Sequence, residues 1–127
     1  RVYLATDKRS KDRKVAIKRY SSTRETFEKE VLIMQDLDHP NICRFFESYD
    51  HGRTVCLVME YCEGGDLLDR MNDQALDERV CVDIIRQVAS ALRHAHGRGI
   101  AHRDLKPENV CLCSRDPSDH RIKVIDW

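Results

Sequence analysis

The hydrophobic pattern of the chain changes at a pair of glycines near its middle, Gly64 and Gly65. Before this pair, apolar residues form short runs rich in Val, Ile and Leu, such as residues 15–20 (VAIKRY) and 54–60 (TVCLVME), which is typical of β-strands. After it, apolar residues recur three or four positions apart over residues 76–98, which predicts an amphipathic helix. The change predicts an α+β chain with a strand-rich first half and a helical second half.

The same patterns predict the order of the elements. The first half is expected to contain a hairpin of strands at 1–6 and 15–20, a helix from Ser22 to about Asp38, and strands at 42–48 and 54–60. Ser22 and Glu25 suit a capping box at the start of that helix. The strand at 54–60 is apolar enough to lie inside a sheet. The second half is expected to contain a short helix at 66–71, the long helix at 76–98, and β stretches at 109–113 and 121–125.

Composition excludes several function classes. Lys and Arg together number 22, as do Asp and Glu, so bulk charge gives no reason to expect a nucleic-acid or membrane partner. Six cysteines include no C-x-x-C pair, which favours reduced cysteines over a disulfide or zinc framework. No signal peptide or long apolar run is present. We expect an intracellular protein, in the cytoplasm or alternatively the nucleus.

The segment HRDLKPEN, residues 102–109, concentrates Arg, Lys, Asn and two acids beside a proline, which is typical of a catalytic loop. With it, VAIK (15–18), HPNI (39–42), VMEYCEGGDL (58–67) and a strand ending in Asp126 stand in the order found in eukaryotic protein kinases. The sequence therefore resembles this family over essentially the whole chain.

The resemblance implies a truncated protein-kinase-like fold. Residues 1–59 would be an N-lobe with one helix C, 60–65 the hinge, and 66–127 the start of the C-lobe. The family's glycine-rich loop would precede Arg1, and the chain would end inside the DFG-like motif, with Trp127 where Phe is usual. We expect the isolated piece to be inactive. We also expect the apolar stripe of the long helix to form exposed hydrophobic surface. This stripe comprises Val80, Ile84, Val88, Leu92 and Ala95.

Four residues are implied to be catalytic. Lys18 resembles the lysine that contacts the α- and β-phosphates of ATP, although it could be an ordinary strand lysine that extends to solvent. Glu30 matches the glutamate of helix C and should pair with Lys18. Asp104 resembles the aspartate that orients the substrate hydroxyl and accepts its proton, and Lys106 would lie close to the transferred phosphate. His102 is expected to be packed rather than to act as a base.

The resemblance also implies a magnesium and nucleotide site. Asn109 and Asp126 would supply oxygen ligands for Mg²⁺, although Asp126 could instead be a turn acid. Met59 falls at the gatekeeper position, and Asp66 lies near the ribose position or begins a helix. The remaining expected contacts to adenine are apolar side chains on its two faces and backbone groups of the hinge. They are Val2, Ala16 and Cys111 for the faces, and Glu60 and Cys62 for the hinge.

The implied function is that of a serine/threonine protein kinase, which transfers the γ-phosphate of ATP to protein hydroxyls with the help of Mg²⁺. Lys106 and Glu108 resemble the serine/threonine-specific form of the loop. The alternatives are a pseudokinase or nucleotide-binding scaffold, and a binding domain unrelated to kinases. Within the family, the segments at 27–42 and 116–126 look most like the calcium/calmodulin-dependent and calcium-dependent kinases. No EF-hand pattern is present, so any calcium control would come from other segments.

Overall fold

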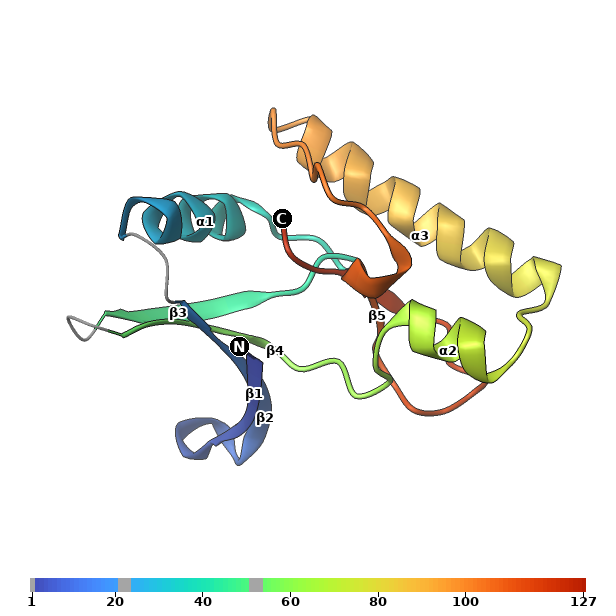
Figure 1. The fold of residues 1–127 in the computed structure, drawn as a ribbon, viewed down its shortest axis with the longest axis horizontal. Helices are drawn as coiled ribbons and strands as arrows, with labels where there is room; N and C mark the ends of the chain where they lie inside the picture. Colours follow the sequence, from blue (N-terminus) through green and yellow to red (C-terminus); the bar gives the residue numbers. More distant parts are fainter. Residues whose placement is uncertain (1, 21–23, 51–53) are drawn as a thin grey trace. The chain divides into compact units, whose positions relative to one another are not determined.

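The computed structural model describes residues 2–20, 24–50 and 54–127 (Figure 1). The chain divides into two compact units. Unit 1 contains Arg1–Asp36 and Arg44–Tyr61, and unit 2 contains Leu37–Cys43 and Cys62–Trp127. No helix in the described residues combines the length and the apolar character needed to span a bilayer.

Unit 1 is a four-stranded antiparallel sheet with one helix. In chain order its elements are β1 (Val2–Asp7), β2 (Arg13–Tyr20), α1 (Arg24–Asp36), β3 (Phe45–Asp50) and β4 (Val55–Glu60). The strand order is β1-β2-β4-β3, so β4 lies inside the sheet as its apolar sequence predicted. Its Leu57 is fully buried.

The helix α1 packs on one face of this sheet, and Figure 1 shows it alongside the strands. Phe27 on α1 forms a buried cluster with Val55 and Leu57 on β4. In the antiparallel register Leu57 is opposite Lys18 and Val55 is opposite Tyr20, and residues opposite one another share a face of the sheet. The residues of β2 at even positions therefore lie on the α1 side.

The connection between β1 and β2 has a defined backbone structure. It contains a 3₁₀ turn, η1 (Lys8–Ser10), followed by Lys11 and Asp12 with φ angles of 52° and 55°. Two successive left-handed residues give the turn the twist of the strands, so β2 begins at Arg13, two residues before the predicted start. In the next connection, Ser22 lies outside the described residues, and its capping box with Glu25 stays a prediction.

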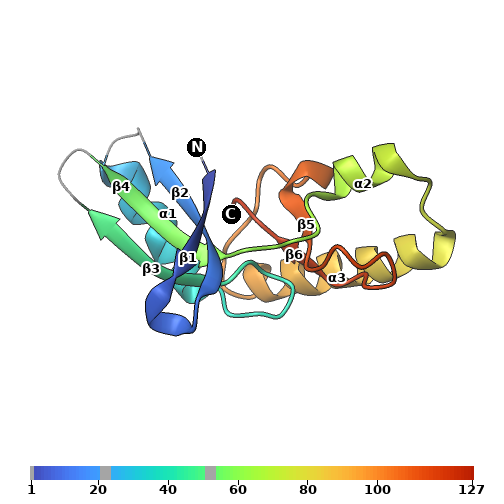
Figure 2. The ribbon, with the colours of Figure 1, turned by 90° about the horizontal axis from the view of Figure 1, so that it is seen from below.

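Unit 2 contains two helices and a small β pair. The helices are α2 (Leu67–Asp73) and α3 (Glu78–His96), and a 3₁₀ turn, η2 (Pro107–Asn109), precedes β5 (Val110–Leu112) and β6 (Ile122–Val124) (Figure 2). Both α-helices begin after an aspartate: Asp66 accepts a hydrogen bond from the backbone of Asp69, and Asp77 from that of Arg79. These side chains satisfy amides that the first helical turn leaves unpaired.

The predicted exposure of the α3 stripe is wrong. Ile84, Val88 and Ala95 are 3%, 8% and 0% exposed, because α3 packs against β6 within unit 2. Leu92 of the stripe is only half-buried, whereas Ala91 is fully buried. The large apolar residues of α3 that are exposed are instead Val82 and Ile85.

The segment Leu37–Cys43 belongs to unit 2, although residues 1–59 were predicted to form one lobe. The backbone of Cys43 donates a hydrogen bond to the carbonyl of Val124, and Val124 donates to the carbonyl of Asn41. The Asn41 side chain also donates to Gln87 on α3. These bonds use the backbone that was expected to begin a strand at Ile42, so β3 begins only at Phe45.

Candidate active site

The predicted site residues are divided between the two units. The set on unit 1 comprises Val2, Ala16, Lys18, Glu30, Met59 and Glu60. The set on unit 2 comprises Cys62, Asp66, Asp104, Lys106, Asn109, Cys111 and Asp126.

Unit 1 brings Lys18 and Glu30 into the expected ion pair. The Nζ atom of Lys18 lies 2.9 Å from Oε1 of Glu30, and their side chains are 23% and 17% exposed. Lys18 lies inside β2, with Arg19 and Tyr20 still to follow in the strand. On α1, Glu30 stands one turn after the buried Phe27, and residues three apart share a helix face. Packing of Phe27 on the sheet therefore directs Glu30 toward Lys18.

The ring of Tyr20 is a neighbour of this pair that the sequence did not reveal. Its centroid lies 5.1 Å from Nζ of Lys18, and the ring packs edge-on against Phe27 with centroids 5.5 Å apart. Among the described residues, the buried hydroxyl of Tyr20 has no hydrogen-bond partner of normal geometry, and burial raises its pKa. The only signal was its position two residues after Lys18, which places both side chains on one face of β2.

Four predicted nucleotide contacts of unit 1 share one face of the sheet. Val2 is opposite Lys18, and Ala16 is opposite Met59, so the four side chains lie on the α1 side. Glu60 is predicted to contribute its backbone. Its N–H donates to the carbonyl of Arg44 at 2.8 Å, so a bond to adenine would fall to the Glu60 carbonyl.

In unit 2 the predicted catalytic loop is a local hydrogen-bonded network. Nζ of Lys106 lies 2.8 Å from Oδ2 of Asp104. The side-chain nitrogen of Asn109 donates to the carbonyl of Asp104 at 2.8 Å and to its Oδ2 at 3.2 Å. The hydrogen bond from Lys106 lowers the pKa of Asp104, and Asp104 in turn raises the pKa of Lys106. Both groups therefore stay charged at neutral pH.

His102 holds the backbone of this loop. Its Nδ1 accepts a hydrogen bond from the N–H of Asp104 at 3.3 Å, so Nε2 carries the proton and donates to the carbonyl of Ile125 at 2.7 Å. The imidazole is buried and also packs edge-on against Trp127. The predicted packed position of His102 is confirmed. Arg103 has a φ of 67°, a conformation unusual for a side chain of this size.

The two predicted magnesium ligands lie at one end of the β5–β6 pair. Val110 is opposite Val124, and the backbone of Ile125 donates to the carbonyl of Asn109 at 2.9 Å. The nitrogen of the Asn109 side chain is engaged by Asp104, which leaves its oxygen as the group for a cation. Asp126 follows with an exposed side chain and a φ of 58°. In the part of the chain that the structure describes, no three His, Cys, Asp or Glu residues form another metal cluster.

The segment before α2 is held against β5 by backbone contacts. Gly64 donates to the carbonyl of Leu112 at 3.0 Å, and Leu112 donates to the carbonyl of Gly65 at 2.9 Å. Asp66 pairs as an isolated bridge with Cys111, while its side chain caps α2. Asp66 is thus the N-cap of α2, and one of its two carboxylate oxygens is used by the cap bond.

The close approach at Gly64 was not visible in the sequence. An added Cβ would lie 2.3 Å from the carbonyl oxygen of Ser114 and 2.6 Å from Cβ of Leu112. The pair of glycines predicted a break between elements, but the break proves to be a tight contact between two backbones.

Residues 1–127 match the family description "Protein kinase domain" over their whole length. The chain belongs to the protein kinase family.

Its relatives include proteins named as calcium-dependent, calcium/calmodulin-dependent and serine/threonine-protein kinases. The chain is 40% identical over 104 residues to calcium-dependent protein kinase 5 of Plasmodium falciparum, which covers 81% of the chain and 18% of that protein. It is 36% identical over 132 residues to calcium/calmodulin-dependent protein kinase type 1 of Macrobrachium nipponense, covering 99% and 38%. The kinase chain therefore spans well under half the length of these relatives.

A solved structure confirms the predicted kinase fold. The crystal structure of Rad53 1–466 in complex with AMP-PNP has a TM-score of 0.88 and 32% sequence identity, covering 99% of this chain and 34% of that one. At this identity and coverage, the strand-rich first part and the helical second part of the kinase chain follow the fold of a nucleotide-bound relative.

Proposed function

We propose that the protein is a magnesium-dependent serine/threonine protein kinase that transfers the γ-phosphate of ATP to hydroxyl groups of protein substrates. The observation that carries the proposal is the environment of Asp104, whose carboxylate lies within hydrogen-bond distance of both Lys106 and Asn109. An exposed carboxylate held this way is ionised and fixed in orientation, as a proton acceptor for a substrate hydroxyl must be.

The remaining catalytic roles follow from charge and position. Lys106 is a cation beside the proton acceptor, where negative charge on a transferred phosphoryl group needs compensation. Lys18, held by Glu30, presents a second cation to the α- and β-phosphates. Phosphoryl transfer requires little covalent chemistry from the protein, so these residues act chiefly by positioning and electrostatics.

The chain also has the donor types that a magnesium nucleotide requires. Asn109 and Asp126 offer an amide and a carboxylate oxygen, the hard ligands that Mg²⁺ prefers, at one end of the β5–β6 pair. When bound, the metal would neutralise charge on the phosphates. Adenine would contact the apolar side chains of Val2, Ala16, Met59 and Cys111, and the backbones of Glu60 and Cys62. Asp66 would face the ribose.

The relatives support a place in the calcium/calmodulin-dependent and calcium-dependent group. Calcium would then regulate the protein through segments other than these residues. We place the protein in the cytoplasm or the nucleus, since no disulfide joins cysteines in the described residues.

Phosphate transfer by the full-length protein carrying Asp104→Asn tests this proposal. With a serine-containing peptide and Mg-ATP, we expect the rate to fall at least about a hundredfold, because the proton acceptor is lost. ATP binding should stay within about threefold of the wild type, since the change leaves the phosphate-contacting lysine intact. The control Asp73→Asn removes an equally exposed carboxylate at the end of α2 and should leave both quantities unchanged.

Two results would contradict the proposal. If the Asp104→Asn variant transferred phosphate as fast as the wild type, Asp104 would not be the catalytic proton acceptor. Nucleotide binding by the wild-type protein without any phosphate transfer would instead favour the alternative of a pseudokinase or nucleotide-binding scaffold.

A further inference from the structure

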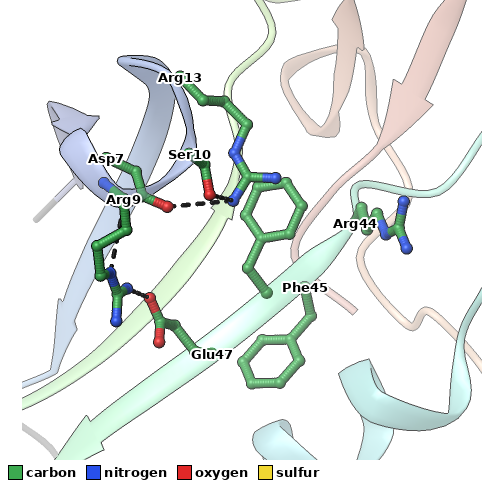
Figure 3. Close-up of a pocket in the computed structure, with 8 residues that line it drawn as sticks. Asp7, Arg9, Ser10, Arg13, Arg44, Phe45 and Glu47 are labelled. Atoms are coloured by element: carbon green, nitrogen blue, oxygen red, sulfur yellow. Dashed lines mark hydrogen bonds and ion pairs between the residues drawn. The ribbon is translucent and has the colours of Figure 1, made fainter.

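A pocket of about 440 Å³ lies in unit 1 between the β1–β2 turn and the start of β3 (Figure 3). Its lining is dominated by three arginines, Arg9, Arg13 and Arg44, and two phenylalanines, Phe45 and Phe46. Figure 3 shows Arg9 and Glu47 on one side of Phe45 and Arg44 on the other. All of these residues belong to unit 1, so the pocket lies within that unit.

The charged part of this pocket is on the face of the sheet away from Lys18. Arg13 is opposite Asp7, and Glu47 is opposite Val58. Because side chains alternate along a strand, the odd positions of β2 lie on the face opposite Ala16 and Lys18. A ligand of this pocket would therefore approach a different surface from the proposed nucleotide.

The acidic residues of the pocket are already used by its own arginines. Asp7 accepts hydrogen bonds from the backbone and the side chain of Arg9, and from Nη2 of Arg13 at 3.2 Å. Glu47 accepts a hydrogen bond from Arg9, whose Nη2 also donates to the hydroxyl of Tyr49. Arg9 thus uses its Nε and Nη2 donors to hold the turn against β3.

Two guanidinium groups keep unused donors. Arg13 lies 3.9 Å above the ring of Phe46, and among the described residues only its Nη2 is hydrogen-bonded, to Asp7 and Ser10. The exposed guanidinium of Arg44 makes no hydrogen bond or ion pair within the described chain. An arginine side chain has five N–H donors. The groups of the pocket that can still bind a ligand are therefore largely cationic N–H donors beside aromatic rings.

The surrounding turn adds to this positive charge. Residues 7–14 (DKRSKDRK) contain five basic and two acidic side chains, in a chain that is neutral as a whole. Lys8 and Lys11 are exposed in this turn. Local charge of this kind attracts an anion with more than one negative charge.

We propose that this pocket binds a phosphorylated serine or threonine side chain in a peptide segment of a protein partner. A phosphoryl group carries nearly two negative charges and three acceptor oxygens at neutral pH, which matches two arginines better than a single carboxylate does. Phe46, beside Arg13, supplies apolar contact for a residue next to the phosphorylated one, whereas the side chain of Phe45 packs toward the core of unit 1. The proposal does not rest on the proposed catalytic function, because none of its residues belongs to that site.

Binding of a labelled peptide to the full-length protein tests the proposal. The probe is the fluorescent pentapeptide Gly-Phe-phosphoserine-Leu-Gly, compared with peptides that have serine or glutamate in the central position. We expect the phosphopeptide to bind at least about tenfold more tightly than either. Arg44→Gln should weaken its binding at least about tenfold, and Arg44→Lys should recover only part of that loss, since lysine keeps the charge without the planar fork.

The matched control is Lys29→Gln, which removes one positive charge from α1 in the same unit, where the side chain is 71% exposed. This variant should bind the phosphopeptide as the wild type does. Equal weakening by Lys29→Gln would overturn the proposal in favour of bulk attraction, as would equally effective competition by a single-stranded oligonucleotide. Equal affinity for the glutamate peptide, or no phosphopeptide binding, would also overturn it. Arg44 has no side-chain partner in the described chain, so the melting temperature should not change.

Discussion

The two units place their candidate catalytic residues in different ways. In unit 1, Lys18 and Glu30 lie on a strand and a helix, and they meet because Phe27 packs on the sheet. In unit 2, Asp104, Lys106 and Asn109 lie within six residues of sequence and bind one another directly. The backbone of this loop is tied to the end of β6 through His102 and Ile125.

This difference indicates which half of the site can change shape. The ion pair in unit 1 is partly exposed, and a helix held by one cluster of side chains can shift while the sheet stays intact. In unit 2, a shift of Asp104 would break its bonds with the side chains of His102, Lys106 and Asn109 at once, so the loop should move only by local unfolding. Substitutions in the two units should accordingly affect different quantities.

The largest effect is expected where backbones touch in unit 2. Gly64→Ala would place a Cβ 2.3 Å from the carbonyl oxygen of Ser114, so the segment before α2 must separate from β5. We expect the free energy of unfolding to fall by about 1–3 kcal/mol, because a backbone contact cannot relax as a side chain does. The urea midpoint of the purified variant measures this loss.

The matched control for that substitution is Gly97→Ala. Gly97 follows α3 with a helical φ of −61°, and an added Cβ would make only ordinary contacts, at 3.4 Å or more. Stability should stay within about 0.5 kcal/mol of the wild type. Similar midpoints for the two alanine variants would mean that the Gly64 contact is loose, and that unit 2 is held less rigidly than its backbone contacts suggest.

An intermediate effect is expected in unit 1 from Glu30→Gln. If the proposed kinase activity holds, loss of the charge beside Lys18 should lower kcat/KM for ATP about tenfold, or about 1.4 kcal/mol. The free energy of unfolding should change by less than about 1 kcal/mol, since the pair is partly exposed. Steady-state kinetics and a urea titration measure the two quantities separately.

The control for Glu30→Gln is Glu25→Gln, one turn and a half earlier on α1. Glu25 also pairs with a lysine, Lys29, but its side chain is 79% exposed. Neither kinetics nor stability should change measurably there. A Glu30→Gln variant that lost stability without losing activity would identify a structural rather than a functional pair.

The order and type of the elements could be predicted from the sequence, because each is encoded by local periodicity. The strand expected from Ile42 failed because residues 41–43 bond to Val124, some eighty positions later in the chain. The apolar stripe of α3 was predicted correctly from the sequence. Its predicted exposure was wrong, because the prediction did not take into account β6, which packs against the helix. Long-range backbone pairing leaves no mark on local hydrophobic periodicity.

The candidate site residues could be named from their motifs, but not the contacts that hold them. No pattern indicated that Asn109 binds the carbonyl of Asp104, or that His102 joins Asp104 to Ile125. Tyr20 was missed for a related reason: an aromatic residue in a strand is usual, and only the structure places its ring beside Lys18. The residue types indicate the chemistry of the site, but the contacts that hold these residues in place form only when the chain folds.

The smallest effect is expected at His39, one of several side chains that link segments of unit 2. Its Nδ1 accepts a hydrogen bond from the backbone of Asn41, and its Nε2 contacts Oγ of Ser90 on α3. Burial lowers its pKa below the ordinary value of 6.5, and the neighbouring charges of His94, Arg93 and Lys123 lower it further. The folded state therefore takes up a proton less readily than the unfolded state does.

The sign of the resulting pH dependence follows from that difference. Well above pH 6.5 neither state is protonated at His39, and its contribution to stability is complete. As the pH falls from about 6.5 toward the lower folded-state value, protonation favours the unfolded chain, and stability should fall by less than about 1 kcal/mol because the ring is only partly buried. Urea midpoints at pH 7.5 and 5.5 should therefore differ less in His39→Gln than in the wild type, whereas His96→Gln, exposed on α3, should keep the wild-type difference. An unchanged pH dependence in His39→Gln would mean that the link to α3 is insensitive to protonation, and that the bonds of Asn41 to Gln87, and of Asn41 and Cys43 to Val124, hold this segment in unit 2.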